Sequence, residues 1–181
     1  MKKAAWLVLL MVLEVPAVQA QGLGFGPLVG YFKSSDSDQG EFMGGGAIRL
    51  KLTPSFGIEG AIHYRQEQYG NGSVTVKSWP VLATGLFYFF PFLYGAVGAG
   101  WYNTTIDYNE SMPGLMEMES ETTQEFGWHF GGGLELPFGR KTKLFGDIRY
   151  VFLNYDFQLV PGSKELKSDF YIITVGLMLG L

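Results

Sequence analysis

Ten charged or titratable side chains occur in segments where every second position is bulky and apolar. At that spacing they share one face of a strand. Histidines on such a face could act as general bases. Opposite charges held away from water would pair instead, because an unpaired buried charge costs several kcal/mol. The ten residues are Arg49, Lys51, Glu59, His63, Arg65, Glu125, His129, Glu135, Asp147 and Arg149.

Neither histidine belongs to a recognisable catalytic pattern. Tyr64 follows His63 and Phe130 follows His129, and no serine stands at a telling spacing from either. The chain has no cysteine, which excludes disulfides and thiolate metal sites. We therefore expect no enzymatic activity, no cofactor and no metal site, and we interpret the ten residues as a structural cluster.

The elements that must position these residues are strands with period-two alternation. In 58–65, Ile58, Ile62 and Tyr64 oppose the polar positions, and the same alternation recurs in 47–52, 125–136, 147–152 and 171–181. The segment 74–89 is less regular, because Pro80 lacks a ladder amide and predicts a bulge or an irregular end. Its polarity does not decide which of its faces points inward.

The composition favours strands that cross a membrane. Glycine occurs 26 times, 16% of the residues are aromatic and only 17% are charged, where a soluble domain has about a quarter charged. After the N-terminal segment, no apolar run is long enough for a membrane helix, since Pro91 interrupts the longest candidate. Strands are the other structure that can cross a bilayer. The formal charge of −4 makes nucleic acid an unsuitable partner.

Residues 1–20 have the pattern of a secretory signal peptide. Lys2 and Lys3 precede an apolar stretch, and Val18-Gln19-Ala20 supplies a small-residue cleavage site. An uncleaved anchor is the alternative, but the stretch is too short to span about 30 Å of hydrocarbon. We predict one further domain, residues 21–181.

The connections between strands alternate between short and long. The short ones are 53–55, 90–92 and 137–142, and the long ones are 34–41, 67–73, 103–123 and 154–168. This alternation predicts an all-β, antiparallel, up-and-down transmembrane barrel of about eight strands, with short periplasmic turns and long extracellular loops. Aromatic residues near both strand ends fit the belts of such barrels. Alternation alone also suits a soluble, lipocalin-like periplasmic carrier.

Three segments resemble the small outer-membrane β-barrel family that includes the OmpA-type barrels. They are Tyr94–Tyr102, Phe126–Glu135 and Phe145–Tyr150, which combine glycines with aromatic residues. The C-terminus is similar to the family's assembly signal, except that Leu181 replaces the usual aromatic residue. The resemblance implies a bacterial outer-membrane location and insertion by the barrel assembly machinery. The signal residues are Thr174, Gly176, Leu179 and Leu181.

The expected function is that of a non-enzymatic outer-membrane barrel that supports envelope integrity or surface interaction. Lipid is the expected partner of its apolar faces, and the acidic loop 103–123 could bind a surface partner. The alternative is a narrow, porin-like channel or a conduit for small ions or hydrophobic molecules. An interior only wide enough for side chains argues against a large pore.

Overall fold

The computed structural model describes residues 22–34, 40–69, 74–108, 121–155, 166–167 and 169–181. The predicted signal peptide lies outside these residues. The described chain consists of strands and turns, and it contains no helix long and apolar enough to cross a membrane.

The ten strand segments form one antiparallel sheet with eight barrel strands, because β4 and β5 are two parts of one barrel strand, and so are β9 and β10. Ser78 on β4 and Val81 on β5 face β3 at Arg65 and Ile62, so both segments keep one register. Segments β9 and β10 likewise share one register against β8. The bounds are β1 (Gly22–Ser34), β2 (Glu41–Thr53), β3 (Phe56–Tyr69), β4 (Val74–Ser78), β5 (Val81–Phe90), β6 (Leu93–Tyr108), β7 (Glu121–Pro137), β8 (Thr142–Tyr155), β9 (Leu166–Lys167) and β10 (Phe170–Gly180).

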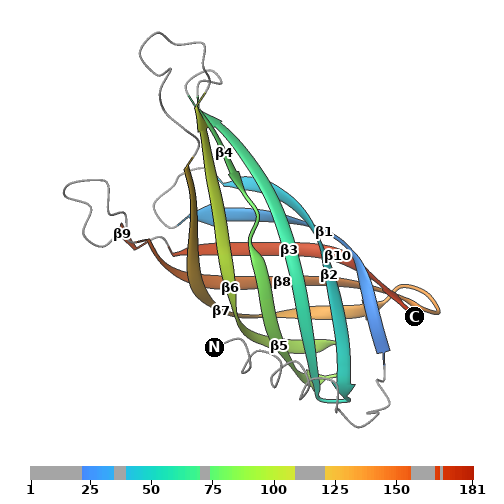
Figure 1. Ribbon diagram of the computed structural model, residues 1–181. Coiled ribbons are helices and arrows are strands. Elements are labelled where there is room, and N and C mark those ends of the chain that lie inside the picture. The colour runs from blue at the N-terminus through green and yellow to red at the C-terminus, as the bar shows by residue number, and fades with distance from the viewer. Residues whose placement is uncertain (1–21, 35–39, 70–73, 109–120, 156–165, 168) are drawn as a thin grey trace, which may run out of the picture.

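The sheet closes on itself because β10 pairs with both β1 and β8 (Figure 1). All the remaining barrel strands pair with the strands that precede and follow them in the sequence. Closure satisfies the backbone polar groups that an open edge would expose. The predicted eight-stranded antiparallel barrel is confirmed.

We expected a bulge or an irregular end at Pro80; the strand is interrupted at residues 79–80, between β4 and β5, and no bulge is present because the register is the same on both sides. The Trp79 amide donates to the Asn103 carbonyl oxygen at 3.0 Å, and the Pro80 carbonyl accepts from the His63 amide at 3.0 Å. Only the missing proline donor interrupts the ladder. Ser78, Leu82 and Thr84 are buried, so the even-numbered positions of β4 and β5 point inward.

The short connections lie together at one end of the barrel, which we call the turn end; the opposite end is the loop end. Strands β3, β4 and β6 project furthest at the loop end (Figure 1). The predicted loop 103–123 was too long, because β6 continues to Tyr108 and β7 starts at Glu121. Its threonines extend the ladder, and the hydroxyls of Thr105 and Thr122 lie 2.7 Å apart. Residues 109–120 lie outside the described chain.

The two faces of the sheet are the reverse of those in a soluble barrel. Bulky apolar side chains such as Phe42, Trp128 and Ile148 point outward, with exposed fractions of 84%, 61% and 50%. Charged side chains point inward and are buried, including Arg49 and Glu59 at 4% each. Soluble monomers rarely expose so much apolar surface, and this band is suited to lipid.

Candidate functional site

The polar network of the lumen starts from two charges on neighbouring strands. Arg49 on β2 stands directly opposite Glu59 on β3. The Arg49 guanidinium donates to Glu59 Oε2 from Nη2 at 2.5 Å and from Nε at 3.1 Å. Its Nη1 reaches across the lumen to Glu135 Oε2 at 2.7 Å. The Arg49 guanidinium therefore connects the three strands β2, β3 and β7.

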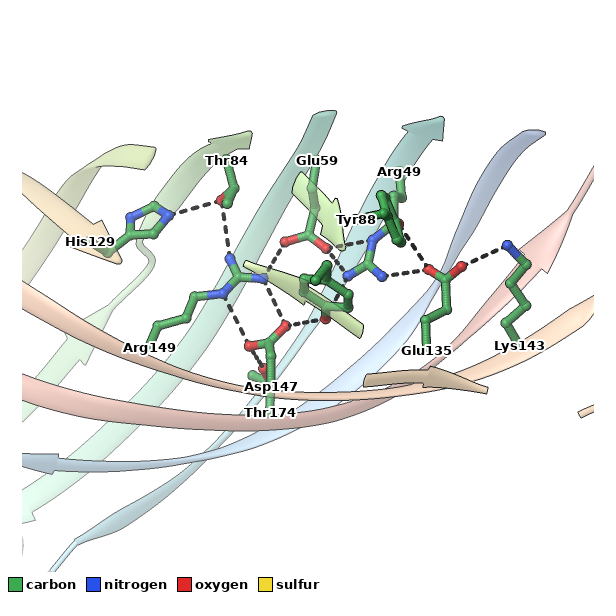
Figure 2. A network of polar contacts seen from close by, with 11 residues as sticks. Arg49, Glu59, Thr84, Tyr88, His129, Glu135, Lys143, Asp147, Arg149 and Thr174 are labelled. Atoms are coloured by element: carbon green, nitrogen blue, oxygen red, sulfur yellow. Dashed lines mark hydrogen bonds and ion pairs between the residues drawn. The ribbon is translucent and has the colours of Figure 1, made fainter. Parts of the chain in front are cut away.

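Arg149 on β8 makes the second set of ion pairs. Its Nη2 lies 2.6 Å from Glu59 Oε1 and 2.8 Å from Asp147 Oδ2. Its Nε donates to Asp147 Oδ1 at 3.0 Å, and Nη1 donates to the hydroxyl of Thr84 at 3.1 Å. The two oxygens of Glu59 thus join the two arginines into one network (Figure 2).

Neutral side chains and a lysine complete the contacts of the other two acids. Asp147 accepts from the hydroxyls of Tyr94 at 2.9 Å and Thr174 at 2.6 Å. Glu135 accepts from Lys143 Nζ at 2.6 Å and from Tyr88 at 3.3 Å. Each acid is therefore held by at least two donors, which offsets the cost of its burial.

Glycines on the inner face of β7 make room for these groups. Gly131 stands opposite Arg149, and Gly133 stands opposite both Asp147 and Tyr94. A Cβ atom on Gly133 would lie 2.5 Å from the Asp147 Cβ and 2.7 Å from the Tyr94 hydroxyl. The glycine pattern of this strand is thus a requirement of the network.

The network is balanced in charge and almost wholly enclosed. Arg49, Arg149 and Lys143 face Glu59, Glu135 and Asp147, three charges of each sign. Only Lys143, whose side chain is 48% exposed, reaches solvent at the turn end. A space of about 10 Å³ remains beside Glu59, His63 and Arg149, room for about one water molecule.

Apolar side chains fill the lumen on the loop side of the network. A buried cluster joins Leu28, Leu82, Tyr102, Leu153, Phe170 and Ile172, with Phe32 packed against it. The guanidinium of Arg65 lies 3.9 Å from the centre of the Phe32 ring and is paired with Glu41 at 3.9 Å. The described lumen is therefore filled by an ionic layer and an apolar layer.

One of the two histidines lies at a distance from a hydroxyl group that is typical of catalytic pairs. His129 Nε2 lies 2.9 Å from the Thr84 hydroxyl, the spacing of a base and a nucleophile. Its Nδ1 has no hydrogen-bond partner among the described atoms, so no acid orients the ring, and the same holds for His63 Nδ1. Both residues are buried. The pair lacks the orienting group and the substrate access that catalysis requires.

The ten predicted residues do not all meet. The structure joins Arg49, Glu59, Glu135, Asp147 and Arg149 directly, and His129 through Thr84. His63 is buried beside them in the space lined by Glu59 and Arg149. The other three lie at different depths: Lys51 over the Tyr88 ring at the turn end, and Arg65 and Glu125 towards the loop end.

Sequence reasoning missed five members of the network: Thr84, Tyr88, Tyr94, Lys143 and Thr174, the last of which was predicted only as part of the assembly signal. Lys143 has the same parity as Asp147 and Arg149 on β8, and this spacing could have identified it. Thr84 and Tyr88 could not be assigned because the phase of their strand was open. Among the described residues, no group of three or more histidines and acids could hold a metal ion.

Three residues of the predicted assembly signal lie on the two faces of β10, and Leu181 follows the end of this strand. Thr174 points inward to Asp147, and a Cβ on Gly176 would lie 2.6 Å from the Phe145 ring. Leu179 lies on the outer face and is 41% exposed, and Leu181 is 75% exposed at the turn end. The two inward positions therefore have packing roles of their own.

Solved structures of outer-membrane barrels share this fold. A major outer membrane protein from Thermus thermophilus matches with a TM-score of 0.63 and 12% identity, covering 88% of this chain and 99% of that one. The N-terminal barrel domain of Pseudomonas aeruginosa OprF matches at 0.54 and 13%, covering 89% and 100%. Yersinia pestis Ail, solved with the heparin analogue sucrose octasulfate, matches at 0.54 and 15%, covering 88% and 97%.

No curated protein matches the chain in sequence. The family model of the outer membrane protein beta-barrel domain matches residues 5–178, nearly the whole chain. The apolar outer face and the closed sheet agree with this match. The protein is located in the bacterial outer membrane, and it belongs to the family of the outer membrane protein beta-barrel domain.

Proposed function

We propose that this protein is a non-enzymatic, non-conducting barrel that supports the integrity of the outer membrane. The observation that carries the proposal is the ionic network that joins β2, β3, β7 and β8 across the lumen. An ion that crossed this layer would have to separate buried charges, which is costly in a medium of low dielectric constant. The apolar layer beyond it adds a second barrier.

The absence of enzymatic activity is part of the proposal. It is supported by the lack of an orienting group at His129 Nδ1 and by the small space around the buried polar side chains. A soluble carrier with an apolar interior is incompatible with the outer-membrane location and with the charged lumen.

Conductance of the purified protein in planar bilayers tests closure of the lumen. We expect no reproducible unitary steps, while a general porin added to the same bilayer verifies that the assay works. Steps of one recurrent size from the wild-type protein would overturn the proposal.

A second experiment tests the role in the envelope. Deletion of the gene in the source bacterium should increase sensitivity to bile salts and to large antibiotics. The wild-type gene should restore resistance, and a copy lacking residues 1–20 should not, because we propose that these residues direct export. Unchanged sensitivity after deletion would contradict a role in integrity.

A narrow ion path is the second candidate, and one contact favours it. Glu135 binds Arg49 through Oε2 and Lys143 through Oε1, so the carboxylate could exchange one cation for the other. Exchange of this kind would open the turn side of the ionic layer. In that case Lys143→Ala would change the frequency of unitary steps, and a silent bilayer with both proteins would exclude the path.

A surface partner and the assembly machinery remain proposals. The acidic segment 103–123, of which residues 109–120 lie outside the described chain, carries carboxylates that would suit a basic partner. Insertion by the barrel assembly machinery is supported by the pattern Thr174, Gly176, Leu179 and Leu181. Pull-down with the isolated loop as a peptide would test the first, and depletion of the machinery would test the second.

A further inference from the structure

A cavity of about 290 Å³ opens at the turn end and borders the ionic layer, which supplies Arg49 and Glu135 to its lining. Among the side chains that line it, Glu135 is the only acid, and five carry positive charge. Two of these, Arg49 and Lys143, are already paired with Glu135. The cationic lining consists of Arg49, Lys51, Arg140, Lys141 and Lys143.

Backbone contacts hold the rim of this cavity in place. The Phe138 amide donates to the Thr142 carbonyl at 2.9 Å, which closes the turn between β7 and β8. The Gly180 amide donates to the Lys141 carbonyl at 2.6 Å, and the Leu181 amide donates to the Leu23 carbonyl at 3.0 Å. The basic turn is therefore fixed against the adjoining strands before any ligand binds.

Three cations of the lining form no ion pair with a described side chain, although Glu135 attracts Lys51 from a longer distance. Within the described chain, no acidic side chain lies at salt-bridge distance from Lys51, Arg140 or Lys141. The Lys51 ammonium lies instead 3.9 Å from the centre of the Tyr88 ring. The connections 53–55, 90–92 and 137–142 contain no acid at all, although the chain carries a formal charge of −4. The turn end is thus a local positive field that would attract an anion.

Apolar groups beside the cavity indicate which anion it fits. Leu23 both lines the cavity and is 37% exposed on the outer face of β1. Leu179, Leu181 and Phe138 are exposed close to it, with fractions of 41%, 75% and 71%. A soluble phosphate would gain nothing from these side chains. A lipid could place its phosphate among the cations and its acyl chains on the leucines.

We propose that this cavity binds the phosphate of an anionic glycerophospholipid. Short turns of such barrels face the periplasm, so the lipid would come from the inner leaflet of the outer membrane. Basic residues near a membrane surface each contribute about 1 kcal/mol towards an anionic lipid, which corresponds to about fivefold in affinity. The site depends on the membrane location and not on whether the lumen conducts.

Native mass spectrometry of the whole protein in detergent tests the site. The probes are phosphatidylglycerol and phosphatidylcholine with identical acyl chains, supplied in equal amounts. We expect the wild-type protein to retain at least tenfold more phosphatidylglycerol. The variant Lys51→Gln with Arg140→Gln and Lys141→Gln should retain both lipids equally, and Lys141→Gln alone should lose about fivefold. The control Lys33→Gln, at an exposed loop-end lysine, should bind like the wild type.

Several outcomes would overturn the proposal. Equal retention of the two lipids by the wild-type protein would overturn it without any variant. The test therefore does not depend on correct folding of the triple variant. Full competition by millimolar glycerol phosphate would assign the cavity to a soluble anion. Sedimentation with purified peptidoglycan, lost in the triple variant and without lipid preference, would assign it to the cell wall. Conductance of the same preparations reports separately on the lumen.

Discussion

Arg149 and Glu59 meet across the barrel interior, with Nη2 2.6 Å from Oε1, although 90 residues separate them in the chain. They belong to β8 and β3, which are not neighbours in the sheet. The contact therefore exists only when the barrel is closed. Because Glu59 also binds Arg49, it couples the closure of the sheet to the whole ionic layer.

Arg149→Ala should destabilise the folded barrel by about 3–5 kcal/mol. The substitution removes two ion pairs and leaves Asp147 and Glu59 buried with fewer donors. Equilibrium unfolding in urea, with the protein in lipid vesicles and the folded fraction read from gel mobility without boiling, measures the change. Lys33→Ala, at an exposed position, is the control and should lie within about 0.5 kcal/mol of the wild type. An equally small effect of Arg149→Ala would show that the ionic layer does not stabilise the fold.

Gly133→Ala should cost about 1–3 kcal/mol of unfolding free energy, because its methyl group would push on Asp147 and Tyr94. Gly60→Ala is a matched control, since a Cβ there meets nothing within 4 Å on the outer face. The control should be neutral or up to about 1 kcal/mol more stable, because alanine lowers the entropy of the unfolded chain. Urea unfolding compares the two variants directly. Equal losses of unfolding free energy in the two variants would mean that glycine is needed for the backbone of the strands and not for space in the lumen.

Much of this arrangement could be read from the sequence because the strand period is two and the inner face is polar. The parity of Glu59 and His63 on one strand, and of Asp147 and Arg149 on another, predicts their inward direction before the register is known. The alternation of short and long connections then predicts the number of strands and the end at which both termini lie.

Partner identity could not be read in the same way. Whether Arg49 meets Glu59, Glu135 or both depends on register and on the diameter of the closed sheet, which are properties of all the strands together. Lys51 and Arg65 share the parity of the network but lie at other depths, because parity carries no information about height along the barrel. The predicted start of the loop at Asn103 was wrong for a different reason: threonine is polar, as loop residues often are, but it is also favourable in strands.

Ile148→Arg should destabilise the barrel by about 2–4 kcal/mol in vesicles, because Ile148 faces outward in the middle of β8. Phe138→Arg places the same charge in the turn next to β7, where the cost should be about 0–1 kcal/mol. Both side chains are at least half exposed, so solvent exposure alone predicts equally small effects. Unfolding in vesicles decides between a lipid-facing and a water-facing surface, and equal small losses would contradict the lipid-facing assignment.

Thr174→Val and Leu181→Phe separate packing from the predicted assembly signal. Thr174 donates to Asp147 at 2.6 Å inside the lumen, so valine should lower the unfolding free energy by about 1.5–3 kcal/mol in the purified protein. Leu181 is 75% exposed, so phenylalanine should change that free energy by less than about 0.5 kcal/mol. If the C-terminal residue is read during insertion, Leu181→Phe should nevertheless increase the rate at which newly exported protein acquires the heat-sensitive gel mobility of the folded barrel. A pulse-chase experiment in cells measures that rate, and an unchanged rate would indicate that leucine is read as well as an aromatic residue.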